Sequence, residues 1–209
     1  LWLGLFLKGA LHYIPHLNRT VDYNLLSEEV SSGFCIIEDK NDHVWYGGPS
    51  GLFLIDKKKA NARPEKISPL RVFNLVQFND SILWAGTRKG SMFQINTRTL
   101  KVTSLPILPH TDLYVTYIYP DSHQRIWIGT DNNGLYVSDR NGSIIASYSK
   151  EQLGSNAIKG IIEDEMNNIW VGTGSGLCCI NPQTENIDRY TTADGLPINQ
   201  FNYSSACKK

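Results

Sequence analysis

The sequence has no excess of either charge and no long apolar run. Its 209 residues include 20 basic and 20 acidic side chains, so it lacks the positive charge with which proteins bind nucleic acid or anionic membranes non-specifically. No apolar stretch approaches the roughly 20 residues of a membrane-spanning helix. A starting methionine and a signal-peptide pattern are also missing. We therefore expect no nucleic-acid or membrane contact in this segment, and we interpret the chain as a piece of a longer protein.

The motifs of common metal and catalytic sites are missing too. The four cysteines show neither CxxC spacing nor paired histidines; they are Cys35, Cys178, Cys179 and Cys207. We interpret them as small buried hydrophobic residues, while a redox or disulfide role stays open. No Ser-His-Asp order, phosphate loop, HExxH or calcium-loop motif occurs. The sequence therefore predicts no cofactor, no metal site and no catalysis in this segment.

What the sequence does have is one repeated pair, a tryptophan followed two residues later by a glycine. All five tryptophans belong to such pairs, and successive tryptophans lie 43, 39, 43 and 43 residues apart. The pairs are Trp2/Gly4, Trp45/Gly47, Trp84/Gly86, Trp127/Gly129 and Trp170/Gly172. A nearly fixed period of this length indicates one structural unit copied along the chain.

Each copy has the pattern of an antiparallel β-unit. The tryptophan run, as in IWIGTDNNGLYVSD, consists of two apolar strands joined by a glycine-containing turn. Another strand, such as IKGIIED, precedes the tryptophan in every copy but the first, and a fourth stretch such as 187–191 follows. Glycine interrupts every run, which disfavours helical repeats of similar period. The sequence therefore predicts an all-β fold, a β-propeller of four-stranded blades.

About five blade repeats fit into one propeller domain or fragment. Their approximate bounds are 1–32, 33–71, 72–113, 114–156 and 157–198, with 199–209 as the inner strand of a further or closing blade. Pairing of the two chain ends would close a five-blade ring and remove exposed strand edges. The alternative is part of a larger ring, whose open edges would pair between two chains in a homodimer.

We interpret the repeated residues as structural. A tryptophan on a middle strand fills the gap between neighbouring blades and buries on the order of 150 to 250 Å², and the glycine lets a neighbour approach. A carbohydrate-stacking role requires that at least one tryptophan be exposed. Asp39, Asp121 and Asp164 each stand six residues before a tryptophan, and this recurrence marks them as part of the architecture.

The blades resemble a known family, the two-component regulator propeller repeat. The resemblance rests on the acidic pair, turn, I-W-x-G-T and G-L of IIEDEMNNIWVGTGSGL and on the tail segment TTADGLPINQF. It implies the periplasmic sensor region of a hybrid two-component regulator, whose parent chain is a histidine kinase with neighbouring propeller and sandwich domains. Such sensors typically bind oligosaccharides, so the resemblance implies a ligand-sensing segment without catalysis. The copies depart from the pattern at Leu5 and Gly48, where threonine is usual.

Candidate ligand-binding residues lie in the loops that enter the inner strands and in the turns between second and third strands, because propellers bind ligands over the central channel on that face. Six side chains there suit sugar hydroxyl groups or acidic sugars: Arg88, His110, Asp131, Asn133, Asn156 and Asn199. Asn156 and Asn199 are also compatible with bracing turns. Two other functions stay open, a propeller glycosidase or lyase and a non-catalytic protein-interaction scaffold.

Overall fold

A computed structural model describes residues 1–5, 9–23, 33–60, 62–87, 91–105, 113–203 and 206. The chain divides into two compact units. Unit 1 comprises residues 1–88 and 92–104, and unit 2 comprises residues 89–91 and 105–209. Within the described ranges, no helix has the length and apolar character that crossing a membrane requires.

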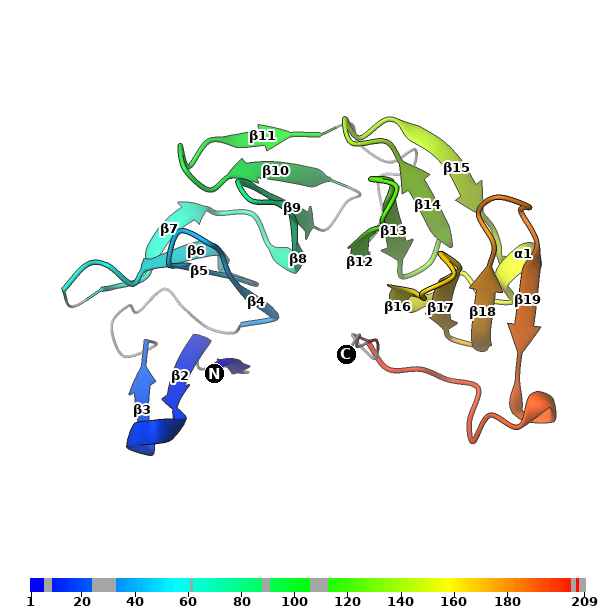
Figure 1. Cartoon of the computed structure of the whole chain (residues 1–209), viewed down its shortest axis with the longest axis horizontal. Coiled ribbons are helices and arrows are strands. Elements are labelled where there is room, and N and C mark those ends of the chain that lie inside the picture. Colours follow the sequence, from blue (N-terminus) through cyan, green and yellow to red (C-terminus); the bar gives the residue numbers. More distant parts are fainter. Residues whose placement is uncertain are drawn as a thin grey trace. The chain divides into compact units, whose positions relative to one another are not determined.

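The described residues of unit 1 form three antiparallel sheets, which we call blades 1, 2 and 3 (Figure 1). In the part of the chain that the structure describes, blade 1 has three strands and the other two have four, in chain order. A short 3₁₀ turn, Pro15–Leu17, separates the last two strands of blade 1. The strands are β1 (Trp2–Leu5), β2 (Gly9–Ile14) and β3 (Arg19–Asp22); β4 (Cys35–Glu38), β5 (His43–Gly48), β6 (Gly51–Asp56) and β7 (Glu65–Ser68); and β8 (Val72–Asn79), β9 (Ile82–Thr87), β10 (Met92–Asn96) and β11 (Val102–Ser104).

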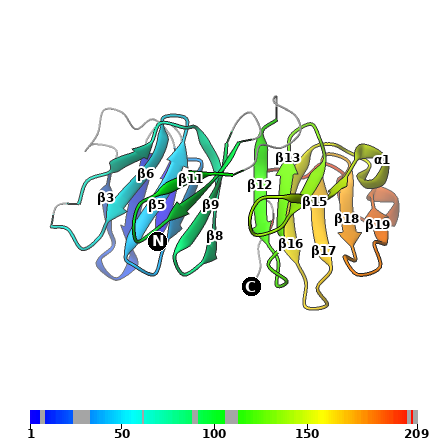
Figure 2. The ribbon, with the colours of Figure 1, turned by 90° about the horizontal axis from the view of Figure 1, so that it is seen from above.

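Residues 113–203 of unit 2 form two four-stranded antiparallel sheets, blades 4 and 5. A short helix, α1 (Lys150–Leu153), lies between them in sequence, and a 3₁₀ turn, Thr192–Asp194, follows the last strand. Figure 2 shows α1 next to the end of unit 2 that holds β18 and β19. The strands are β12 (Val115–Pro120), β13 (Ile126–Thr130), β14 (Leu135–Ser138) and β15 (Ile144–Tyr148); and β16 (Ile158–Glu163), β17 (Ile169–Thr173), β18 (Gly176–Ile180) and β19 (Ile187–Tyr190).

Each four-stranded sheet is a meander of consecutive strands, as a propeller blade requires. The repeated tryptophan occupies one register position on the second strand: Trp45 pairs with Ile37 on one side, and Trp127 pairs with Tyr119. Within each unit the first strands of consecutive four-stranded blades lie next to one another, β4 beside β8 and β12 beside β16. The predicted all-β fold of four-stranded propeller blades is confirmed, whereas closure of a ring stays a prediction.

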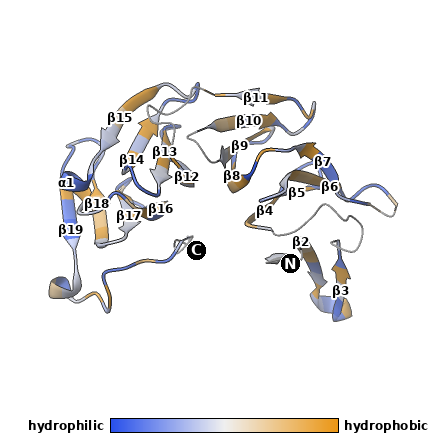
Figure 3. Ribbon diagram, turned by 180° about the vertical axis from the view of Figure 1, so that it is seen from behind, coloured by the Kyte–Doolittle hydropathy of each residue, from blue (hydrophilic) through white to orange (hydrophobic). Residues whose placement is uncertain are grey.

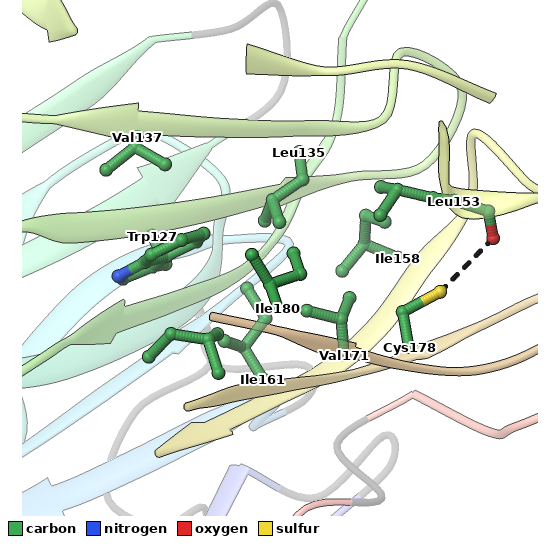
Figure 4. Close-up of a cluster of buried hydrophobic side chains, with 10 residues drawn as sticks. Trp127, Leu135, Val137, Leu153, Ile158, Ile161, Val171, Cys178 and Ile180 are labelled. Carbon is green, nitrogen blue, oxygen red and sulfur yellow. Dashed lines mark hydrogen bonds between the residues drawn. The ribbon is translucent and has the colours of Figure 1, made fainter. Parts of the chain in front are cut away.

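The core lies between neighbouring blades of a unit. Trp45, Trp84 and Trp127 are at most 1% exposed, so their rings are part of the core, whereas Trp2 and Trp170 are only half-buried. Figure 3 shows the third strand β18 in hydrophobic orange and the outer strand β19 in blue. Ten buried side chains form the core between blades 4 and 5 (Figure 4): Trp127, Leu135, Val137, Leu153, Ile158, Ile161, Ile169, Val171, Cys178 and Ile180.

The glycine after the tryptophan is a contact point for the following blade in blades 2 and 4. A Cβ atom added to Gly47 would lie 2.6 Å from Val72 Cγ1, and one added to Gly129 would lie 2.6 Å from Ile158 Cγ2. Val72 and Ile158 are the first residues of β8 and β16. The glycine is required there because a side chain of the next blade fills the space that its own Cβ would take.

Gly4 and Gly86 do not show this side-chain contact. Gly4 is exposed, and a Cβ added to it would lie 2.7 Å from the backbone carbonyl oxygen of Gly33. The expected close approach therefore occurs at Gly4, where the neighbour is the backbone of Gly33. Unlike Gly47 and Gly129, Gly4 does not lie in a buried contact between blades. Gly86 is buried and pairs with Asn74 and Met92 of its own blade. Because blade 3 is the last blade of unit 1, a contact of Gly86 with a following blade stays a prediction.

Phe201 takes the corresponding place beside blade 5. Its ring would lie 3.3 Å from a Cβ added to Gly172, and its backbone N–H donates to the carbonyl of Thr173 at 3.2 Å. In this respect Phe201 resembles the first residue of a following blade. Residues 199–203 form no strand, and most of the remaining predicted inner strand, up to residue 209, lies outside the described residues.

Candidate functional site

An aspartate organises the turn before the tryptophan strand in three blades. In blade 4, Asp121 Oδ2 accepts the indole N–H of Trp127 at 2.9 Å and the Arg125 Nε–H at 2.6 Å. Asp121 Oδ1 accepts the backbone N–H groups of His123 and Arg125, both at 2.9 Å. Equivalent indole bonds, each 2.8 Å long, join Trp45 to Asp39 and Trp170 to Asp164. The periodic carboxylates therefore hold turns and tryptophans, which confirms that they belong to the architecture.

Hydrogen bonding also sets the charge state of Asp164. Burial alone would raise the pKa of this carboxyl, but bonds from the Trp170 indole, from the side chain and backbone of Asn168 and from the Met166 backbone outweigh it and lower the pKa. Asp164 is therefore ionised at neutral pH, as an acceptor of several N–H groups must be.

The glutamate before this aspartate contacts the preceding blade. Glu163 is 6% exposed, and its carboxylate accepts both the hydroxyl of Ser122 at 2.7 Å and the Ser122 backbone N–H at 2.9 Å. In unit 1, Glu38 accepts the indole N–H of Trp2 at 3.1 Å. In each acidic pair, the aspartate thus holds its own blade and the glutamate binds the blade before it.

Two of the predicted ligand-binding residues line a common pocket in unit 2. Asn133 lies in the turn between β13 and β14, and Asn156 lies in the loop between α1 and β16. The pocket has a volume of about 290 Å³, and its lining residues are Asn132, Asn133, Tyr136, Ser147, Tyr148, Ser149 and Asn156. We call it the asparagine pocket.

Backbone hydrogen bonds fix the two loops of the asparagine pocket to each other. The Gly134 N–H donates to the Asn156 carbonyl at 2.9 Å. The Thr130 hydroxyl donates to the Gly134 carbonyl at 2.8 Å and accepts the Asn133 N–H at 3.0 Å. Gly134 has a φ of +75°, in the left-handed region that favours glycine. The turn that carries Asn133 is therefore braced on both sides.

The asparagine pocket offers hydrogen-bonding groups without a formal charge. Its described lining contains amides, hydroxyls and two tyrosines, and no Asp, Glu, Lys, Arg or His. Burial raises the pKa of Tyr136, although a hydrogen bond with the Asn133 side chain acts in the opposite direction. Burial also raises the pKa of Tyr148, whose ring stacks on Trp127 with centroids 5.9 Å apart. Planar amides beside neutral phenols suit a ligand with many hydroxyl groups.

Asp131 lies outside this pocket and belongs to a different polar cluster. It accepts the hydroxyl of Tyr203, and its Oδ1 lies 3.6 Å from Lys159 Nζ. The same Nζ stands 3.6 Å from the centroid of the Tyr203 ring, a cation–π contact. Burial raises the pKa of Tyr203, and the bond to Asp131 adds to this shift. Sequence analysis did not predict Lys159 or Tyr203 as site residues. The signal for Lys159 was a basic residue within the apolar strand sequence IKGIIED.

The remaining predicted residues are not brought to the asparagine pocket. Asn199 Oδ1 accepts the backbone N–H of Thr192 at 2.7 Å, so this side chain braces the 3₁₀ turn Thr192–Asp194. Arg88 and His110 lie outside the described residues. The structure therefore brings together Asn133 and Asn156, and places Asp131 and Asn199 elsewhere in unit 2.

Sequence prediction also missed a second periodic aromatic residue. A tyrosine on or just after the last strand packs against the repeated tryptophan in three blades. The ring centroids lie 5.2, 5.9 and 5.7 Å apart in the pairs Trp2/Tyr23, Trp127/Tyr148 and Trp170/Tyr190. The signal was the spacing, since each tyrosine follows its tryptophan by 20 or 21 residues.

The cysteines within the described residues are free thiols. Cys178 is 1% exposed and its Sγ lies 3.3 Å from the Leu153 carbonyl oxygen, and burial raises the pKa of this thiol to about 11. The interpretation as a buried small residue is confirmed for Cys178, while Cys35 and Cys179 are half-buried and Cys207 lies outside the described residues. No group of three or more His, Cys, Asp or Glu side chains in the described part of the chain is placed to hold a metal ion.

Meandering blades with one tryptophan register define a β-propeller chain. A solved β-propeller domain, that of Cps50 (Swd1) from Myceliophteria thermophila, superposes with a TM-score of 0.64 at 14% identity; the match covers 88% of this chain and 65% of that one. The extracellular domain assigned to the hybrid two-component system BT3049 of B. thetaiotaomicron superposes with a TM-score of 0.78 at 23% identity, covering 100% of this chain and 29% of that one.

The family of the repeats follows from the sequence match. Residues 110–132 and 152–175 match the two-component regulator propeller model, which confirms the resemblance to that family. A relative, Histidine kinase P4 of Formosa agariphila, is 26% identical over a match covering 91% of this chain and 18% of the relative. The chain thus spans about a fifth of that kinase, and less than a third of the BT3049 structure.

Proposed function

We propose that this chain is a ligand-sensing, extracytoplasmic segment of a hybrid two-component regulator, located in the periplasm and without catalysis of its own. The repeats of the two-component regulator family and the similarity to a histidine kinase support the regulatory context. The parent chain would then carry the kinase, with neighbouring propeller and sandwich domains as partners of this segment.

The ligand we propose is a neutral or weakly charged oligosaccharide bound at the asparagine pocket. The observation that carries this proposal is the convergence of Asn133 and Asn156, from two different loops, on one pocket of about 290 Å³. Tyrosine rings and hydroxyl groups complete the lining, and this combination recognises sugar rings through their faces and their hydroxyl groups.

A panel of neutral oligosaccharides tests the proposal. The thermal midpoint of the protein is measured with and without each glycan, because a ligand that binds only the folded state raises that midpoint. Asn133→Ala should abolish the shift that a binding glycan produces. Asn141→Ala is the matched control, since Asn141 is exposed in the turn after β14 and does not line the pocket.

Each alternative function has its own outcome in this experiment. A shift that Asn133→Ala leaves unchanged would place the ligand elsewhere, and a panel without any shift would contradict direct sensing by this segment. Cleavage of a glycan, followed by the appearance of new reducing ends, would favour a glycosidase or lyase. Binding of protein but no sugar would favour a scaffold.

A further inference from the structure

A second and larger pocket lies in unit 1, between blades 1 and 2. Its volume is about 580 Å³. Blade 1 contributes side chains from β1, β2 and β3 and the residue after it, while blade 2 contributes the connection between β6 and β7. Figure 1 shows this connection extending from blade 2 on the side of β3. The lining residues are Trp2, His12, Val21, Tyr23, Lys57, Lys59, Ala62 and Arg63, and we call the site the cationic pocket.

The aromatic wall of the cationic pocket contains a repeated tryptophan that is not fully buried. Trp45, Trp84 and Trp127 are closed off completely, at 0%, 0% and 1% exposure, whereas Trp2 is half-buried and lines the pocket. Its ring stacks on His12 with centroids 4.3 Å apart and planes 8° from parallel. Trp2 is therefore not closed off like these three tryptophans, and part of its surface is accessible in the pocket.

The charged side chains that line this pocket are all basic. Lys57, Lys59 and Arg63 belong to the β6–β7 connection, and the lining includes no Asp or Glu. Among the described residues, Lys59 Nζ forms two long ion pairs, at 3.8 Å to Asp56 and 3.9 Å to Glu65. The described residues provide no hydrogen bond or ion pair for Arg63. Three cations facing one pocket favour an anionic ligand.

Glu38 holds the two walls in place from outside the pocket. Its carboxylate accepts the Trp2 indole N–H at 3.1 Å and also binds Lys57 Nζ. One acidic side chain of blade 2 thereby fixes an aromatic residue of blade 1 and a lysine of its own blade. A site whose groups are already fixed loses less conformational entropy when a ligand binds.

We infer that the cationic pocket binds an acidic saccharide, with Trp2 in contact with a sugar ring and Lys59 and Arg63 binding its carboxylate or sulfate group. The choice of a saccharide rests on the proposed function, whereas the requirement for negative charge rests on the lining. Lys57 contributes less charge because Glu38 already neutralises it. The cationic pocket lies in unit 1 and the asparagine pocket in unit 2, so variants can separate the two sites.

Isothermal titration with matched probes tests this inference. The acidic probes are tetragalacturonate and a heparin tetrasaccharide, and the neutral probe is fully methyl-esterified tetragalacturonate, which keeps the same rings without the charge. We expect an acidic probe to bind and the ester to bind at least about tenfold more weakly, because charged hydrogen bonds are lost. Arg63→Glu and Lys59→Glu should each weaken acidic binding by about tenfold or more. Trp2→Leu should weaken the binding of the acidic probes and of the neutral ester.

Lys58→Glu is the matched control, because Lys58 carries the same charge in the same connection but does not line the pocket. Its effect should stay below about threefold, as for an exposed surface charge. An equal loss in Lys58→Glu and Arg63→Glu would overturn the inference in favour of general surface charge. Absence of binding by both acidic probes, or equal binding of acid and ester, would also overturn it.

Asn133→Ala separates this inference from the proposed function. We expect it to leave acidic binding unchanged, since Asn133 lies in unit 2. Loss of acidic binding in Asn133→Ala would assign the ligand to the asparagine pocket and overturn a second site. If an acidic probe binds in a way that depends on Arg63 and no neutral oligosaccharide shifts the thermal midpoint, the cationic pocket is supported. The same result would contradict the neutral ligand proposed for the asparagine pocket.

Discussion

Phe78 occupies the position, six residues before Trp84, at which Asp39, Asp121 and Asp164 bind the tryptophan of their own blades. The rings of Phe78 and Trp84 lie with centroids 6.0 Å apart. Trp84 is 0% exposed, and its indole nitrogen has no hydrogen-bond partner among the described residues. Blade 3 therefore replaces a buried hydrogen bond with an aromatic contact.

This difference predicts unequal costs for one substitution at two equivalent sites. Trp84→Phe removes an indole N–H that has no described partner, whereas Trp127→Phe removes the indole donor of Asp121 Oδ2. Both sites are fully buried, so the loss of packing is similar. We expect Trp127→Phe to lower the free energy of unfolding by about 1–3 kcal/mol more than Trp84→Phe. Urea unfolding followed by circular dichroism measures both, and equal losses would contradict the prediction.

The contact of Glu163 with Ser122 predicts coupling between blades 4 and 5. Glu163→Ala should lower the free energy of unfolding by about 1–3 kcal/mol, because the buried carboxylate of Glu163 loses its hydrogen bonds with Ser122. Glu165→Ala is the control, since Glu165 is exposed two residues later and its loss should cost less than about 0.5 kcal/mol. A double substitution with Ser122→Ala should cost less than the sum of the single substitutions. Strict additivity would show that the hydroxyl contact between Ser122 and Glu163 contributes nothing.

The space beside two equivalent glycines predicts different responses to alanine. A Cβ at Gly129 would approach Ile158 to 2.6 Å, whereas one at Gly172 would stay 3.3 Å from Phe201. Gly129→Ala should therefore cost about 1–3 kcal/mol through overpacking, and Gly172→Ala clearly less. Thermal unfolding of the two variants checks this order. A larger loss for Gly172→Ala would contradict it.

The lowered pKa of Asp164 predicts a specific dependence on acid. Because the folded-state pKa lies below the unfolded value, the carboxylate stabilises the fold above about pH 4. This contribution is lost as the pH falls through the folded-state pKa. Asp164→Asn should be less stable than the wild type at pH 7, since an amide N–H₂ group would face the Trp170 donor. The difference should narrow between about pH 5 and pH 3.

Urea unfolding at each pH measures this difference directly. Asp188→Asn serves as the control, because Asp188 is exposed on β19 and its replacement should leave stability almost unchanged at both ends of the range. A constant difference between Asp164→Asn and the wild type across this acidic range would show that the titration of Asp164 does not contribute.

The fold was predictable because its signals repeat, while the sites depend on contacts between segments that do not. Tryptophan, glycine and aspartate recur at fixed spacing, so one interpretation applies to every blade. Asn133 and Asn156 were predictable as loop residues, but their meeting at one pocket depends on the bond from Gly134 to Asn156. Arg63 carries no periodic signal at all, and its place beside Trp2 follows from the packing of blade 2 on blade 1.

The space beside the repeated glycines admits different side chains, Val72, Ile158 and Phe201 in three cases. At these contacts the glycine is constant, whereas the side chain that packs against it differs from case to case. When a blade is duplicated or exchanged in evolution, its glycine can still accept a side chain of the new neighbouring blade. The loops can then diversify while the framework stays assembled.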